Sequence, residues 1–132
     1  MRIIYTDKAP EPTGHRSQAI VHDETIYVSG QLAVDPAKPG SVPESMGDQT
    51  AQALANVDAI LKEAGTEFKN VLKLTVFITE MSEWKDVDKV FGEKFGDHKP
   101  ARSVVQVNRL HHDAKIQIEA TAFIPESRPF WH

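Results

Sequence analysis

One arginine is the first candidate for chemistry in this chain. Arg102 is the only charged residue of the run "ARSVVQV", which is rich in valine and predicts a strand. A guanidinium presents a planar fork of donors that matches a carboxylate or a phosphate. At a boundary between subunits it would be partly desolvated, where a charge-assisted hydrogen bond is stronger than in open water. Two interpretations stay open: an anion-binding site, or a cross-strand ion pair with a glutamate.

Polar residues near the end of the chain are the next candidates, because carboxylates transfer protons and amides can hold water. Gln117 and Glu119 lie two residues apart in "KIQIEATAFI", so a strand there places both side chains on one face. If this strand pairs with the strand that begins at Arg102, all three side chains converge. Asp86 and Asp88 could also do acid/base work, although a solvated helix face is the simpler explanation for them.

Other common chemistries lack their sequence signatures. The chain has no cysteine, which excludes thiol nucleophiles, thiolate metal sites and disulfides. Neither a glycine-rich phosphate motif nor a serine nucleophile elbow occurs. Of the six histidines only His111 and His112 are adjacent, and such a pair beside Asp113 is typical of a solvated turn. We therefore predict no metal site.

Composition sets the broad class of the protein. The chain of 132 residues has a formal net charge of -4 and no basic run, so it lacks the electrostatic footprint of a nucleic-acid-binding protein. No apolar run approaches the ~18 residues that a membrane span needs, and the start lacks a signal-peptide pattern. We expect a single domain over residues 1–132, a cytoplasmic location, and neither nucleic acid nor membrane as a partner.

The first half of the chain predicts a hairpin and a helix. Two β-rich runs on either side of His22-Asp23-Glu24 predict the hairpin. Ser45 can cap the helix and Gly65 can end it. The apolar residues between them recur at helical spacing and indicate one buried face, formed by Ala53, Leu54, Val57, Ile60, Leu61 and Ala64.

The second half predicts a strand, a helix and two more strands. The strand is "NVLKLTVFITE", with an alternating apolar set of Leu72, Leu74, Val76 and Ile78. Ser82 can cap the second helix, and Gly96 and Pro100 close it. Its apolar stripe consists of Trp84, Val87, Phe91 and Phe95. The segment "NRLHHDA" suits a loose hairpin between the last two strands.

The predicted order is β-β-α-β-α-β-β, which indicates an α+β domain. Helices interleaved with strands that also form hairpins favour one mixed sheet with both helices on the same face. The other face is then bare and half apolar. Self-association is the best explanation for such a face.

Three stretches of this chain, in order, resemble the Rid (YjgF/RidA) family: "SQAIVHDETIYVSGQLAVDP", "QTAQALANVDAILKEAGTEFKNVLKLTVFIT" and "PARSVVQVNRL…AKIQIEATA". The resemblance runs from about Gly14 to Ala122. It implies a chorismate-mutase-like fold assembled as a homotrimer, with the sheets in an internal barrel and clefts between subunits. It also implies a hydrolase that converts reactive 2-enamino and 2-imino acids to 2-keto acids and ammonia, without metal or organic cofactor.

The resemblance assigns roles to four matching positions. Arg102 matches the arginine that clamps the substrate carboxylate. Ser29 and Gly30, in "VSGQ", match the small residues that line the cleft. Val104 stands where many members have a cysteine that contributes mainly backbone contacts, so the missing thiol should matter little.

Three positions depart from the family pattern. Arg16 stands where a tyrosine is usual, and Asp88 stands where an asparagine is common. Gln117 stands where the deaminases commonly carry a glutamate credited with orienting or activating water. A glutamine amide can position water but cannot accept its proton, so we expect weakened or redirected deaminase activity. Glu119 is either a displaced base or a charge at the rim of the interface.

Two further alternatives stay open. Arg16 beside Arg102 would make the cleft doubly cationic and favour a substrate with a second anionic group, unless Arg16 pairs with Asp88. The protein could also be a non-catalytic one that binds or senses a keto acid or another small anion in the same cleft. In the tail, Phe130 and Trp131 could pack across the subunit boundary or belong to a frayed terminus.

Overall fold

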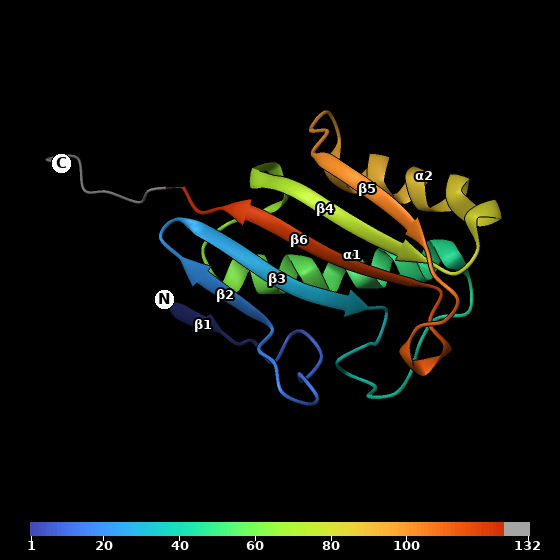
Figure 1. Ribbon diagram of the computed structural model, residues 1–132, viewed down its shortest axis with the longest axis horizontal. Helices are drawn as coiled ribbons and strands as arrows, with labels where there is room; N and C mark the ends of the chain where they lie inside the picture. Colours follow the sequence, from blue (N-terminus) through green and yellow to red (C-terminus); the bar gives the residue numbers. More distant parts are fainter. Residues whose placement is uncertain (126–132) are drawn as a thin grey trace, which may run out of the picture.

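The computed structural model describes residues 1–125 and contains one six-stranded sheet with two helices on one side of it (Figure 1). Phe130 and Trp131 therefore lie outside the described residues. The strands are β1 (Arg2–Ile4), β2 (Ala19–His22), β3 (Thr25–Leu32), β4 (Val71–Ile78), β5 (Ala101–Gln106) and β6 (Ile116–Phe123). The helices are α1 (Met46–Glu63) and α2 (Trp84–Phe95), with short 3-10 turns η1 (Phe68–Asn70), η2 (Met81–Glu83) and η3 (His111–Asp113).

The sheet confirms the predicted mixed architecture and adds one strand to it. The strand order is β1-β2-β3-β6-β4-β5, and all neighbours are antiparallel except β4 and β5. The sequence prediction omitted β1, which is only three residues long and pairs with β2 at one edge. No helix in the described part of the chain is both long and apolar enough to cross a membrane.

The predicted hairpin between the last two strands is wrong. β6 lies between β3 and β4, whereas β5, among the strands of residues 1–125, pairs only with β4 and forms the opposite edge of the sheet from β1. The reason is the helix between β4 and β5, because a helical crossover returns the chain parallel to the strand that it left. Arg102 and Gln117 are therefore not on neighbouring strands.

Local signals in the first half of the chain are confirmed. The β2–β3 turn places Asp23 at a φ of 54°, a left-handed conformation that aspartate tolerates. The Ser45 side chain accepts a hydrogen bond from the Asp48 N–H at 3.1 Å and caps α1. Gly65 follows α1 at a φ of 91°, where a side chain would be strained.

Two local predictions in the second half are wrong. Ser82 does not cap α2: it lies in η2, and Glu83 precedes the helix without a capping hydrogen bond from its side chain. Leu72 is 48% exposed rather than buried. The pairing of β4 with β6 shifts between Val71 and Lys73, so Val71 takes the inward place that the alternation gave to Leu72.

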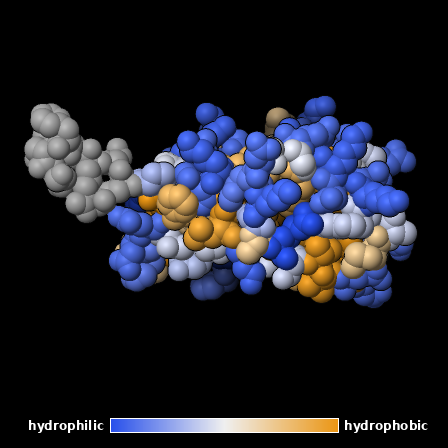
Figure 2. Space-filling view, turned by 90° about the horizontal axis from the view of Figure 1, so that it is seen from above, coloured by the Kyte–Doolittle hydropathy of each residue, from blue (hydrophilic) through white to orange (hydrophobic). Residues whose placement is uncertain are grey.

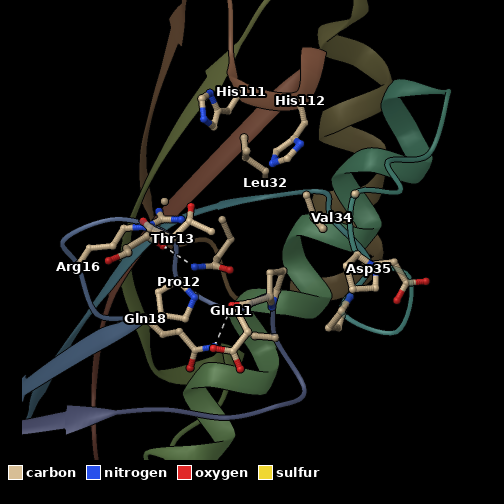
Figure 3. Close-up of a pocket in the computed structure, with 18 of the residues that line it drawn as sticks. Glu11, Pro12, Thr13, Arg16, Gln18, Leu32, Val34, Asp35, His111 and His112 are labelled. Carbon is tan, nitrogen blue, oxygen red and sulfur yellow. Dashed lines mark hydrogen bonds between the residues drawn. The ribbon is translucent and has the colours of Figure 1, made fainter.

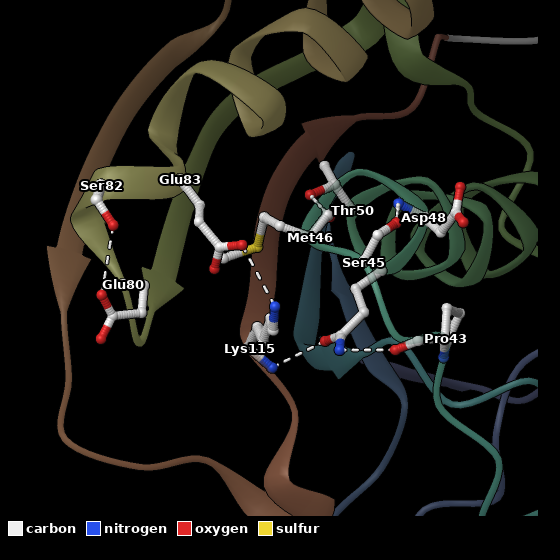
Figure 4. A network of polar contacts seen from close by, with 10 residues as sticks. Pro43, Ser45, Met46, Asp48, Thr50, Glu80, Ser82, Glu83 and Lys115 are labelled. Atoms are coloured by element: carbon white, nitrogen blue, oxygen red, sulfur yellow. Dashed lines mark hydrogen bonds and ion pairs between the residues drawn. The ribbon is translucent and has the colours of Figure 1, made fainter.

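A network of polar contacts fixes the start of β6 (Figure 4). The buried Gln49 side chain on α1 donates to the Pro43 carbonyl at 2.8 Å and accepts from the Lys115 N–H at 2.8 Å. The Lys115 ammonium lies 3.3 Å from a carboxylate oxygen of Glu83, at the start of α2. These contacts join both helices to the residue that precedes β6, and so they hold Gln117 in place.

The two faces of the sheet have different surroundings. The face toward α1 and α2 carries the buried core, including Ile26, Leu74, Val76, Ile116 and Ile118. No helix of the described residues covers the opposite face (Figure 1), and Tyr27, Val105 and Phe123 are exposed there at 51%, 42% and 41%. The surface seen from above in Figure 2 also shows hydrophobic areas among mostly hydrophilic residues.

Candidate active site

Arg102 lies at the edge of the sheet and points toward α2. Its register partner on β4 is Leu74, which faces the helices, so Arg102 shares that face. Its guanidinium carbon is 4.5 Å from the ring centroid of Trp84 and 5.3 Å from that of Phe91. Its Nη1 donates to Asp88 Oδ1 at 3.1 Å. The arginine is therefore held by aromatic faces and one carboxylate, all from α2.

A groove of about 490 Å³ opens beside this arginine. Its lining includes Asp88 and Phe91 of α2 together with His98 and Lys99 of the loop before β5. The Nε2 of His98 donates to the Val71 carbonyl at 2.7 Å, which anchors this loop against β4. Val104 lies two residues beyond Arg102, half-buried against the core on the same face.

Ser29 and Gly30 form an irregular point in β3. The pairing of β3 with β6 shifts between Val28 and Gln31, so these two residues bulge out of the ladder. The Ser29 N–H donates to the Gln18 carbonyl at 2.9 Å, and the Ser29 hydroxyl donates to the Ser17 carbonyl at 2.7 Å. Ser29 is thus occupied in tying β3 to the loop that precedes β2.

Gly30 gives Gln117 its position. A β-carbon at residue 30 would lie 2.5 Å from Nε2 and 2.8 Å from Cδ of Gln117. Only a glycine lets the amide rest against the backbone there. The half-buried Gln117 pairs with Leu32 of β3 and Phe77 of β4, and its side chain lies on the face that no helix covers.

Arg16 borders a cavity of about 390 Å³ that Ser29 and Gly30 also line (Figure 3). Its Nε donates to the Thr13 carbonyl at 3.1 Å, and its terminal nitrogens have no hydrogen-bond or ion-pair partner within residues 1–125. The predicted alternative, a pair between Arg16 and Asp88, is not formed within one chain, where Asp88 binds Arg102. Val34 and Asp35 lie across the cavity, with His111 and His112 at a third side.

The cavity beside Arg16 has mixed charge. Three carboxylates, those of Asp7, Glu11 and Asp35, line it together with Arg16. Glu11 accepts a hydrogen bond from the Tyr5 hydroxyl, and this bond raises the pKa of Tyr5 above its usual value. Asp35 accepts a hydrogen bond from the Ala37 N–H at 2.9 Å. The doubly cationic cleft expected from Arg16 and Arg102 is therefore not formed within one chain.

Glu119 lies in a third place. It is exposed on the same face as Gln117 and borders a shallow depression with Tyr27, Lys73 and Thr75. Glu119 lines neither the groove beside Arg102 nor the cavity beside Arg16. Within residues 1–125, no group of three or more metal-ligating side chains is arranged to hold an ion.

The chain thus forms two partial sites on opposite faces of the sheet. One contains Arg102, Asp88 and Val104 on the face toward the helices. The other centres on Gly30, which lies against Gln117 on the uncovered face and, with Ser29, lines the cavity of Arg16, although Gln117 itself does not line that cavity. Sequence analysis missed the contact of Trp84 and Phe91 with the arginine and gave both residues only a core role. The signal was present, because Trp84, Asp88 and Phe91 follow the i, i+4, i+7 spacing of one helix face.

Comparisons with known proteins agree with this fold and extend over most of the chain. The model of the family described as Endoribonuclease L-PSP matches residues 6–124. A 2-iminobutanoate/2-iminopropanoate deaminase from Bos taurus is 42% identical over 121 residues, covering 92% of this chain and 88% of the relative.

Two solved structures are similar in both fold and sequence. E. coli TdcF with bound serine has a TM-score of 0.91 and 35% identity, covering 95% of this chain and 100% of that chain. RidA from the Antarctic bacterium Psychrobacter sp. PAMC 21119 has a TM-score of 0.90 and 35% identity, covering 94% of this chain and 100% of that chain.

Proposed function

We propose that this chain, which belongs to the Endoribonuclease L-PSP family and within it to the Rid proteins, hydrolyses 2-imino and 2-enamino acids to 2-keto acids and ammonia. The observation that carries the proposal is the likeness, along nearly the whole chain, to a relative named for this activity. A relative solved with bound serine supports a small amino-acid-like ligand. The net charge of -4 does not favour an RNA substrate.

Arg102 is the residue that we assign to the substrate carboxylate. Asp88 occupies only Nη1, so the remaining donors of the guanidinium have no partner within the described residues. Two parallel N–H donors match the two oxygens of a carboxylate. The substrate is thereby held at one end, and its imine carbon projects away from the arginine.

Gln117 is the residue that we assign to the attacking water. The Gln117 side-chain carbonyl accepts a hydrogen bond from water, which directs the water oxygen toward the carbon of the protonated imine. A new C–O bond forms, the π electrons of C=N return to nitrogen, and the water proton leaves to solvent because an amide cannot accept it. In the resulting carbinolamine the amine takes a proton from solvent and the hydroxyl gives one to solvent; the C–N bond then breaks as the C=O bond forms, which releases ammonia and leaves the keto acid.

A second copy of the chain is needed to unite these two groups. Arg102 faces the helices at one edge of the sheet, whereas Gln117 lies on the uncovered face. We therefore propose a homotrimer in which the β5 edge of one subunit meets the Ser29–Gly30 bulge of the next. The exposed apolar residues Tyr27 and Phe123 support such an assembly. The cytoplasmic location stays a prediction.

Arg16 is the residue that we assign to substrate selection. Its terminal nitrogens, which have no partner in the described part of the chain, would contact a second anionic group of an imino acid bound between the subunits. The same cavity contains the carboxylates of Asp7, Glu11 and Asp35, which offset the positive charge of Arg16. Selection of a second anionic group therefore depends on its direct contact with Arg16. Glu119, in a separate depression, is assigned to the rim of the interface.

The test is turnover of freshly generated 2-iminopropanoate, followed as pyruvate release above the rate in buffer. We expect Arg102→Ala to lose at least 100-fold in kcat/KM, in line with about 3 kcal/mol for a hydrogen bond to a charged group. Arg2→Ala, which removes a charge from β1 on the far edge, is the matched control. Equal rates for wild type and Arg102→Ala would refute the assignment of Arg102 to the substrate carboxylate. Pyruvate binding without turnover would support the non-catalytic alternative.

A further inference from the structure

The arginine proposed to grip the substrate is surrounded by three side chains of a single helix face. Trp84, Asp88 and Phe91 reach Arg102 from α2, and the distances of 4.5 Å and 5.3 Å to the rings lie within the range of cation–π contact. The Arg102 side chain is 29% exposed, although β5 is an edge strand with mostly exposed residues. Within residues 1–125, the hydrogen bond and the ring contacts of its guanidinium all come from α2.

We infer that Trp84 and Asp88 are positioning residues that fix the Arg102 guanidinium for the substrate carboxylate. The inference rests on the proposed function and deepens it. The ring face of Trp84 fixes the orientation of the guanidinium plane. The hydrogen bond from Nη1 to Asp88 prevents the guanidinium from rotating within that plane. Together they leave one edge of the fork for the ligand.

Two observations favour this role over a simple structural ion pair. First, the Asp88 side chain is 57% exposed and, within the described residues, accepts one hydrogen bond from Arg102 at 3.1 Å, so it does not occupy the whole fork. Second, the rings of Trp84 and Phe91 already lie against the guanidinium, so Arg102 loses less rotamer freedom when it binds a ligand than an arginine without such contacts would. The arrangement therefore raises anion affinity without adding a contact to the ligand.

Asp88 also places a negative charge beside the proposed carboxylate site. A neutral side chain of the same shape would keep the hydrogen bond to Arg102 and remove this repulsion. Asparagine is that side chain, because its oxygen accepts from Nη1 as aspartate does. Asp88→Asn is therefore expected to bind anions as tightly as wild type or more tightly, whereas Asp88→Ala is expected to bind them less tightly.

The experiment compares paired variants in steady-state turnover of 2-iminopropanoate and in pyruvate binding by calorimetry. Trp84→Leu keeps apolar bulk without a ring face, and Trp84→Phe keeps a ring face. We expect KM and the pyruvate Kd to rise about fivefold in Trp84→Leu and in Asp88→Ala, with kcat within twofold of wild type. Trp84→Phe and Asp88→Asn are expected to restore both values. Glu93→Ala, which removes an exposed carboxylate of α2 outside the groove lining, is the matched control.

The outcomes separate this inference from the proposed function. If wild type neither turns over the imine nor binds pyruvate, the proposed function is wrong. If wild type is active and the Leu and Ala variants keep its KM and Kd, the inference is wrong. A loss of thermal stability with unchanged KM and Kd, or equal losses in Trp84→Leu and Trp84→Phe, shows a purely structural role and also overturns it.

Discussion

At the scale of single residues, the chemistry of the site depends on whether a position carries an amide or the carboxylate of the same shape. Gln117 has the size of a glutamate but no proton-accepting group, and Gly30 leaves no room between its backbone and that amide. The position of the side chain at residue 117 is therefore set by packing, whereas its chemistry is set by one atom. The two properties can be changed separately.

Gln117→Glu is expected to increase kcat for 2-iminopropanoate at least tenfold at pH 7, because a carboxylate both orients the water and accepts its proton. The new activity should fall as pH decreases toward the ordinary glutamate pKa of about 4.3, since protonation removes the base. A pH–rate profile of wild type and variant measures this. A variant with unchanged kcat would show that proton transfer does not limit turnover.

Gly30→Ala is expected to cost about 1–3 kcal/mol in the free energy of unfolding, because the new methyl group collides with Gln117. Urea denaturation measures the loss, and adding Gln117→Ala should restore stability without restoring turnover. Gly47→Ala in α1 is the control, since nothing lies within 4 Å of a β-carbon there. An equal loss from both single variants would refute the contact.

At the scale of secondary-structure elements, the sequence predicted the kinds of element well and one adjacency badly. The cap at Ser45 and the stop at Gly65 act through nearby backbone groups, so their signals are local. The neighbour of β5 depends instead on the path of the chain through α2. The composition of the valine-rich segment does not indicate which strand it pairs with. Leu72 was misplaced for a related reason, because a bulge shifts alternation without changing composition.

The same reasoning covers the candidate site. Sequence resemblance assigned Arg102, Ser29, Gly30 and Gln117, and the structure explains how two of them fit together, since Gly30 rests on Gln117. The sequence could not reveal that Arg102 and Gln117 lie on opposite faces of the sheet. Alternation shows which residues of one strand share a face, but it does not show which face of one strand corresponds to which face of a strand that is not its neighbour. Trp84 was misjudged because an apolar stripe on a helix is usually core.

Gln49→Ala tests how elements cooperate to hold β6. The variant leaves the Lys115 N–H and the Pro43 carbonyl without their partner, and we expect a loss of about 2–3 kcal/mol in the free energy of unfolding. Gln52→Ala is the control on the same helix, because within residues 1–125 its amide forms a single hydrogen bond, to Asn56 at 3.0 Å. A loss no larger than that of Gln52→Ala, measured by urea denaturation, would show that the network contributes little.

At the scale of the whole molecule, the proposed homotrimer would account both for the uncovered sheet face and for the separation of Arg102 from Gln117. We expect light scattering to give a particle three times the 14.7 kDa mass of the chain. Tyr27→Lys places a charge on the apolar face and should shift the protein toward single subunits, with loss of turnover. Glu24→Lys, in the exposed β2–β3 turn, is the control. An active single subunit would exclude a shared site.

The two partial sites also differ in how far apart their residues stand along the chain. Trp84, Asp88 and Arg102 belong to one short helix–strand segment, whereas Gly30 and Gln117 come from strands near opposite ends. Loops that are short in sequence close at a smaller entropic cost and form sooner. We therefore expect the contacts of Trp84 and Asp88 with Arg102 to form earlier during folding than the contact of Gly30 with Gln117.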